Sequence, residues 1–385
     1  FMIKYMFNKH IKRLFKVAKD HIGLEIKILK RPKSFQILNY QFNNIKIKKH
    51  TKLYDNILID GTWENANYWI RLKLILKALG LEESIKTGLL GKYQRRSAKS
   101  AFKNFNFANI YDTQSINYNK EKNKKLAINL IKKSRDQKDI LNWDLPENIP
   151  GKFLYDSLLK ALQTPTIDLK NPDLVNLVAQ ALHQIEIAKA VFSNNKYSLY
   201  ICSHTLGIIY GSLAWMAVKN NVDVICLYGD YGSARFWKIN KLFQLKETGL
   251  SYPSKKEFSV SDLKSKKFID VGKKHLFKRL NGESNDISGD AAFKNTNSID
   301  RDTILKYFNW PKNKKIVTVY THNWADYPHS SSVKNYVDFK EWTDITIEIA
   351  RQNTNVLWLF KEHPIIYRYN YKKENTISYI ISQIN

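Results

Sequence analysis

Short apolar runs that alternate with helical segments constrain the fold of this chain most strongly. Residues 56–60 read as a buried strand and 68–79 as a helix that stops at Gly80. Later, a strand is expected at 197–202, a helix at 207–219 and a strand at 222–228. Such alternation is typical of a parallel, doubly wound α/β sheet. A further strand is expected near 84–89, and a helix-rich region over about 120–190.

The same alternation begins again near Arg301. A helix over 302–308 precedes a strand at 315–320, and a helix over 339–351 leads to a strand at 355–360. Two Rossmann-like domains facing a cleft are therefore expected, with the C-terminal domain truncated because it has few strands. The predicted division is a basic N-terminal segment (1–52), an N-terminal domain (53–234), a polar linker without clear period (235–300) and a partial C-terminal domain (301–385). The chain starts at Phe1, so it is also expected to be incomplete.

The charge is strongly basic, with 63 Lys and Arg against 35 Asp and Glu and a net charge of +28. A basic surface attracts polyanions, which would include nucleic acids and anionic lipid. Lysine supplies most of this charge, whereas base-edge readout favours arginine, and Trp and Tyr fall largely in apolar segments. A nucleic-acid partner is therefore not expected, although a basic nucleic-acid-binding protein stays an alternative. Lys-rich composition without any binding role is the other explanation.

Residues 3–18 have the spacing of an amphipathic helix with one apolar and one lysine-rich face. Two interpretations stay open: a helix lying in an anionic membrane surface, or a helix docked on the protein with a solvated basic face. No apolar stretch is long and uncharged enough for a transmembrane span. The two cysteines, Cys202 and Cys226, lie in apolar runs and favour a reducing compartment. A cytoplasmic protein is expected, with peripheral contact to the inner face of a membrane.

Polar side chains follow four of the expected strands, where open α/β sheets bind their ligands. Asp60, Glu64 and Asn65 follow the first strand, and Ser203-His204 follow the strand at 197–202. The other two sets follow the strands of the second domain: His322, Asp326 and His329, and Lys361, Glu362 and His363. Cations and imidazoles can hold a phosphate, while a carboxylate can take a proton from a hydroxyl. Taken singly, each such residue is more often a helix cap or a structural group.

Several of these stretches together carry a resemblance. They are Ile59-Asp-Gly-Thr-Trp-Glu-Asn-Ala-Asn-Tyr-Trp69, Ile149-Pro-Gly-Lys-Phe-Leu-Tyr-Asp156, Val317-Thr-Val-Tyr-Thr-His-Asn-Trp-Ala-Asp-Tyr-Pro-His329 and Asn355-Val-Leu-Trp-Leu-Phe-Lys-Glu-His-Pro364. In this order they resemble bacterial capsule and surface polysaccharide biosynthesis proteins, which are GT-B-type glycosyltransferases with a Lys-x-His-Pro motif. The similarity spans residues 53–364.

The resemblance implies transfer of a sugar from a nucleotide-activated donor to a growing glycan or glycolipid, without a metal or other cofactor. Lys361 and His363 would contact the donor phosphate, and Pro364 would shape the turn. His322, Asn323, Asp326 and Glu362 complete the expected donor side. Asp60 or Glu64 is the expected base, with Asp326 a further catalytic candidate, and Asn65, Ser203 and His204 are expected to contact the acceptor.

Other activities stay open. A nucleotide-sugar epimerase or a polyol-phosphate transferase would suit the same architecture. A metal-dependent enzyme would need a DxD motif, and Asp300-Arg301-Asp302 is better explained as a helix cap. Ser203 and His204 are sequence neighbours, which is poor geometry for a nucleophile and its base, and no G-x-S-x-G motif accompanies them.

Overall fold

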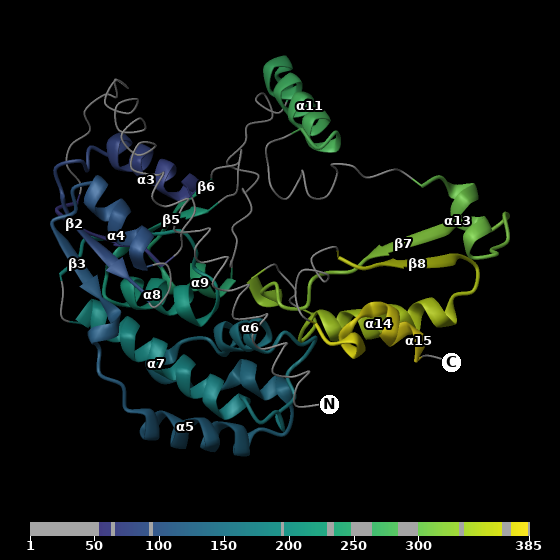
Figure 1. Cartoon of the computed structure of the whole chain (residues 1–385), viewed down its shortest axis with the longest axis horizontal. Coiled ribbons are helices and arrows are strands. Elements are labelled where there is room, and N and C mark those ends of the chain that lie inside the picture. Colours follow the sequence, from purple (N-terminus) through teal and green to yellow (C-terminus); the bar gives the residue numbers. More distant parts are fainter. Residues whose placement is uncertain are drawn as a thin grey trace, which may run out of the picture. The chain divides into compact units, whose positions relative to one another are not determined.

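The computed structural model describes residues 54–62, 66–91, 95–193, 196–228, 235–247, 264–283, 299–330, 335–363 and 371–383. The expected amphipathic helix over residues 3–18 lies outside these ranges. The described residues form an α/β fold with a six-stranded sheet and a separate two-stranded parallel sheet (Figure 1).

The larger sheet has the strand order β3-β2-β1-β4-β5-β6. Its strands are β1 (Asn56–Asp60), β2 (Ile85–Leu90), β3 (Asn109–Asp112), β4 (Leu199–Cys202), β5 (Asp223–Tyr228) and β6 (Arg235–Ile239). β1 pairs parallel with both β2 and β4, with Ile59 opposite Gly88 on one side and Ile201 on the other. Ile57, Leu58 and Ile59 are fully buried, as expected for a strand covered on both faces. This order is that of a Rossmann-like sheet, as predicted.

Contacts divide the chain into two compact units. The first comprises the described residues of Phe1–Ser115 and Tyr197–Ile201, and the second those of Ile116–Lys196 and Cys202–Asn385. The first unit holds β1 to β3, most of β4, α3 (Ala66–Ala78), α4 (Arg95–Asn104) and the 3-10 turn η1 (Thr113–Ser115). The domain boundaries expected from the sequence stay a prediction.

Four helices form the core of the second unit: α5 (Lys120–Lys133), α6 (Gly151–Leu162), α7 (Leu174–Ser193) and α8 (Gly207–Lys219). α7 packs against α5, α6 and α8, and α6 also packs against α8 (Figure 1). The turns η2 (Gln137–Asn142) and η3 (Pro146–Asn148) precede α6, which begins at Gly151 against the carbonyls of Ile140 and Leu141. The structure confirms the predicted helix at 207–219 with the same bounds.

The smaller sheet is a βαβ arrangement in the same unit. β7 (Ile316–Tyr320) and β8 (Leu357–Lys361) are parallel, with Tyr320 opposite Lys361, and α14 (Phe339–Gln352) connects them. Trp324, Phe339 and Ile377 form a buried cluster beneath this part. α13 (Arg301–Tyr307), η4 (Pro328–Ser330), η6 (Lys373–Asn375) and α15 (Ile377–Ser382) complete the segment.

The stretch expected to be a linker, residues 235–300, contains regular elements. β6 pairs antiparallel with β5, and α9 (Leu242–Glu247) and α11 (Lys266–Leu280) follow. β6 is a short edge strand and α11 has no buried residue, so neither carries the long apolar run that reveals a core element. No described helix is long and apolar enough to cross a membrane.

Candidate functional site

The carboxyl ends of β7 and β8 place two imidazoles side by side. The ladder continues one residue past β7, where the amide and hydroxyl of Thr321 donate to the Lys361 carbonyl at 3.0 and 3.1 Å. Beyond this point the rings of His322 and His363 lie with their centroids 6.1 Å apart. We call His322, Asn323 and His363 the strand-end cluster. It occupies the position at which α/β sheets bind ligands.

Packing fixes His322. Its ring stacks on Phe339, the first residue of α14, at 4.2 Å between centroids and an angle of 16°. Its Nδ1 is 3.2 Å from the carbonyl oxygen of Asn323. When Nδ1 donates to this carbonyl, Nε2 becomes the free acceptor of the neutral ring, and protonation turns it into a donor.

His363 is half-buried, and burial lowers the pKa of its imidazole from the usual 6.5. The neighbouring His322 lowers the pKa further, whereas the carboxylate of Asp326 raises it. The ring is therefore kept neutral in the free protein, and an anion placed beside it would favour the protonated form. A pair of such imidazoles suits a ligand that brings its own negative charge.

Asn323 is buried and firmly held. The Tyr371 hydroxyl donates to its side-chain oxygen at 2.7 Å. The next residue, Trp324, is fully buried, and its indole donates to the Asn375 carbonyl at 2.8 Å. Segment 371–375 thus ties down the loop that carries the cluster.

Lys361 and Glu362 have different surroundings from those two imidazoles. Lys361 is exposed, and its ammonium lies 5.6 Å from the ring centroid of Tyr320, its partner across the ladder. Glu362 accepts from the amides of Ile377 and Ser378 and so caps the start of α15. Asp326 is exposed and affects the cluster through its charge on His363.

A buried network links the loop after β7 to helix α6. His329 Nδ1 lies 2.6 Å from Asp156 Oδ1, and Asp156 is almost completely buried. Burial raises the pKa of the Asp156 carboxyl, an effect that the hydrogen bond from His329 opposes. Alongside, the Tyr155 hydroxyl donates to Asp338 Oδ2 at 2.6 Å, and burial next to that carboxylate raises the pKa of Tyr155.

The other ring nitrogen of His329, Nε2, is buried and has no hydrogen-bond partner among the described residues. An aspartate that accepts from Nδ1 leaves Nε2 as the proton-accepting atom of a neutral imidazole. Buried polar atoms normally have a partner, so this nitrogen is suited to receive one from a ligand. The sequence points to His329 through its place in the polar loop, but Asp156 lies 173 residues away and sequence reasoning missed it.

Asp60, the expected base, lies in the first unit and is fully buried. Its Oδ1 accepts from the amide and hydroxyl of Thr62, at 2.8 and 2.6 Å, which makes a tight turn after β1. The hydroxyl of Tyr68 donates to the Asp60 carbonyl. The strand-end cluster belongs to the second unit. Two neighbours of the same stretch, Glu64 and Asn65, lie outside the described residues, as does Pro364.

Ser203 and His204 lie in the second unit, between β4 and α8. Contrary to the expectation from their adjacency, the two side chains meet, with His204 Nδ1 2.9 Å from Ser203 Oγ. The His204 ring also lies 5.5 Å from that of Tyr210. Ser203 is buried, and its carbonyl accepts from the thiol of Cys226.

The Asp300-Arg301-Asp302 stretch is a helix cap, as predicted. Asp300 precedes α13, and its carboxylate accepts from the amide and hydroxyl of Thr303 at 2.8 and 2.9 Å. These bonds lower the pKa of Asp300. No group of three or more His, Cys, Asp and Glu side chains in the described part of the chain could hold a metal ion.

Comparison with protein-family models, curated proteins and solved structures finds no match to this chain.

Proposed function

We propose that this protein is a glycosyltransferase that moves a sugar from a nucleotide-activated donor to a surface glycan. The observation that carries the proposal is the pairing of His322 and His363 at the carboxyl ends of two parallel strands. In sugar transfer the bond between the anomeric carbon and the phosphate oxygen breaks, and the electron pair leaves with the nucleoside phosphate. Imidazoles and a nearby ammonium can stabilise that developing charge.

In this proposal His322 and His363 hold the leaving phosphate, and Lys361 adds positive charge. Asn323 is a positioning residue, because its buried side chain is held by Tyr371 beside the two rings. Asp326 tunes the charge on His363. Glu362 holds the adjacent turn through α15.

The attacking hydroxyl of the acceptor must lose a proton. Asp60 and Glu64 are the bases proposed from the sequence, and His329 is a further candidate on structural grounds. Asp156 orients the imidazole of His329 so that Nε2 is the nitrogen that can accept a proton. Nε2 has no hydrogen-bond partner among the described residues, and an acceptor hydroxyl would supply one. The proton would pass to Nε2 as the hydroxyl oxygen bonds to the anomeric carbon. Ser203 and His204 stay proposed acceptor contacts.

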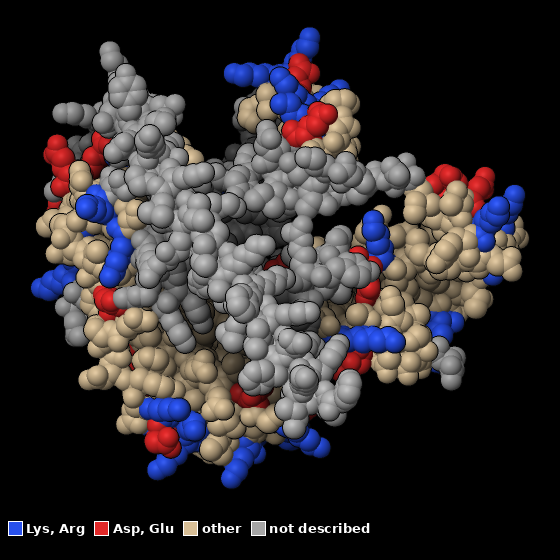
Figure 2. All heavy atoms as spheres, in the orientation of Figure 1, with Lys and Arg blue, Asp and Glu red and all other residues tan. Residues whose placement is uncertain are grey.

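Peripheral contact with an anionic membrane is part of the proposal, and α11 supports it. Ile269, Leu276 and Leu280 lie on one face of this helix together with Lys273, and Lys267, Lys274 and Lys278 lie on the opposite face together with Val271. The large apolar side chains are exposed, Leu276 by 55% and Phe277 by 65%. Lysine and arginine also gather on α11 in Figure 2. A basic helix with exposed apolar side chains suits a lipid interface.

The proposed activity is tested with a panel of nucleotide-activated sugars and oligosaccharide acceptors, with products identified by mass. We expect a mass increase of one sugar residue on an acceptor, and its loss in His322→Ala, His363→Ala and Lys361→Ala. Conversion of the donor into an isomer of unchanged mass, separated by chromatography, without an acceptor product would favour an epimerase. Appearance of a phosphodiester-linked product would favour a polyol-phosphate transferase. Wild-type turnover in His363→Ala and Lys361→Ala would contradict the assignment of the donor side.

A further inference from the structure

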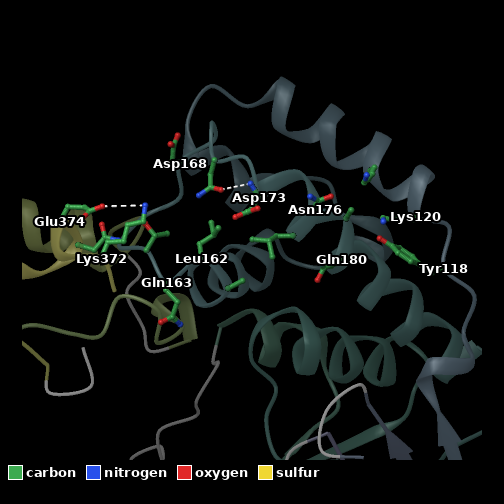
Figure 3. A pocket seen from close by; sticks show the side chains of 17 residues that line it. Tyr118, Lys120, Leu162, Gln163, Asp168, Asp173, Asn176, Gln180, Lys372 and Glu374 are labelled. Carbon is green, nitrogen blue, oxygen red and sulfur yellow. Dashed lines mark hydrogen bonds and ion pairs between the residues drawn. The ribbon is translucent and has the colours of Figure 1, made fainter. Parts of the chain in front are cut away.

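The second unit contains a wide polar groove that shares no residue with the strand-end cluster. Its volume is about 1120 Å³. Helices α5, α6 and α7 and the turn η6 contribute to its lining (Figure 3). Pockets for small molecules usually measure about 300–1,000 Å³ and are mostly apolar. The size and lining of this groove therefore suit a longer and more polar ligand.

The polar lining combines amide side chains with charged ones. Gln163 ends α6, Asn171 lies in the following loop, and Asn176 and Gln180 lie on α7. A carboxamide donates and accepts hydrogen bonds at once, as each hydroxyl of a sugar does. In Figure 3 Tyr118 lies at one end of the groove, where its exposed ring offers an apolar surface with a polar tip.

The charges of the groove balance. Lys120, Lys124 and Lys372 line it together with Asp168, Asp173 and Glu374, so the ionised lining side chains sum to zero. In a chain with a net charge of +28, a surface for a polyanion would not carry so many carboxylates. The lining therefore favours a neutral ligand.

The groove is connected to the strand-end cluster through segment 371–375. The carbonyl of Asn375, which lines the groove, accepts from the indole of Trp324 at 2.8 Å. Tyr371, at the other end of this segment, donates to Asn323 of the cluster at 2.7 Å. An occupant of the groove would thus contact the segment that holds the proposed donor site.

We propose that this groove binds a neutral oligosaccharide and is the binding site of the growing glycan. The inference rests on the proposed function for the role of that glycan, while the binding itself is independent of transfer.

The test is calorimetry of the full chain with maltohexaose and chitohexaose as neutral probes and an oligogalacturonate hexamer as the anionic probe. We expect at least one neutral probe to bind. Asn176→Ala and Gln180→Ala should each weaken its binding about two- to tenfold, the range for losing one hydrogen bond. Both residues are exposed, so their replacement should leave the fold intact, and Asn313→Ala, another exposed amide outside the groove, is the matched control.

Binding of the anionic probe alone, no binding of any probe, or equal affinity in the groove variants and the control would overturn the inference. Transfer activity separates its failure from that of the proposed function. Sugar transfer without groove-dependent oligosaccharide binding would refute the groove alone, whereas groove-dependent binding without transfer from any donor would refute the glycosyltransferase alone.

Discussion

At the scale of single residues, the neutral state of His363 is the property most open to measurement. Burial and His322 lower its pKa, so the ring is uncharged near neutral pH in the free protein. A bound phosphate adds negative charge nearby and raises that pKa again. Binding of a nucleoside diphosphate should therefore take up a proton.

This linkage predicts that nucleotide affinity increases as the pH falls from 7.5 toward about 6, within roughly one unit of the usual histidine value. Calorimetry in buffers of different ionisation enthalpy measures the proton uptake directly. His363→Gln should bind more weakly and lose most of the pH dependence. An affinity that rises with pH in the wild-type protein would contradict the assignment.

The pair formed by Asp156 and His329 makes a second prediction, on stability. Asp156→Ala leaves a buried imidazole without its partner, and such a loss costs about 3 kcal/mol of unfolding free energy. Urea unfolding would show a lower midpoint. Asp144→Ala, which removes an exposed carboxylate, is the matched control and should stay within about 0.5 kcal/mol. Equal midpoints for the two variants would show that the buried pair does not hold the loop to α6.

At the scale of elements, the start of α8 depends on one glycine. Gly207 has a φ of +60°, and a Cβ there would lie 2.6 Å from the Tyr327 ring and 2.7 Å from Ser157 Oγ. Gly207→Ala should destabilise the protein by about 2 kcal/mol or more, because left-handed backbone alone costs a side chain roughly 1–2 kcal/mol. Gly272 in α11, with nothing within 4 Å of a Cβ, is the control. Thermal unfolding should show a lower midpoint for Gly207→Ala and no loss for Gly272→Ala.

The two faces of α11 allow the proposed contact with lipid to be tested. Vesicles that contain phosphatidylglycerol should bind the full chain, and vesicles of phosphatidylcholine alone should bind it less. Replacing Lys274 and Lys278 by alanine should weaken binding roughly tenfold or more, at about 1 kcal/mol per basic residue near the surface. Leu276→Ser should also weaken it, whereas Ile349→Ser, an exposed apolar residue of α14, should not. If none of these substitutions in α11 changes vesicle binding, α11 is not the contact with lipid.

At the scale of the whole molecule, the elements that could be predicted from the sequence are the ones that are buried. Strand β1 and helix α8 carry apolar runs that must be covered, so their positions could be read from pattern alone. The edge strand β6 and the exposed helix α11 bury little and were missed. The predicted polar loop after β7 does carry His322 and His329.

Long-range pairing marks the limit of sequence reasoning at the site. The contact between Asp156 and His329 joins residues 173 positions apart, and no local pattern reports it. Glu362 looked like a ligand residue from its place at a strand end, yet its contacts are those of a helix cap. The net charge of +28 likewise gives no indication of the groove, where the charges of the lining side chains sum to zero.

The most direct test of the central claim is the NMR response of the imidazoles to nucleoside diphosphates. The full chain, labelled with ¹⁵N in histidine, would be titrated with UDP, GDP, CDP and dTDP. The ring signals of His322 and His363 should shift together with at least one of them, while His275 on the exposed helix α11 should stay in place. If no nucleotide moves the two rings, or His275 moves equally, the strand-end cluster does not hold the donor phosphate.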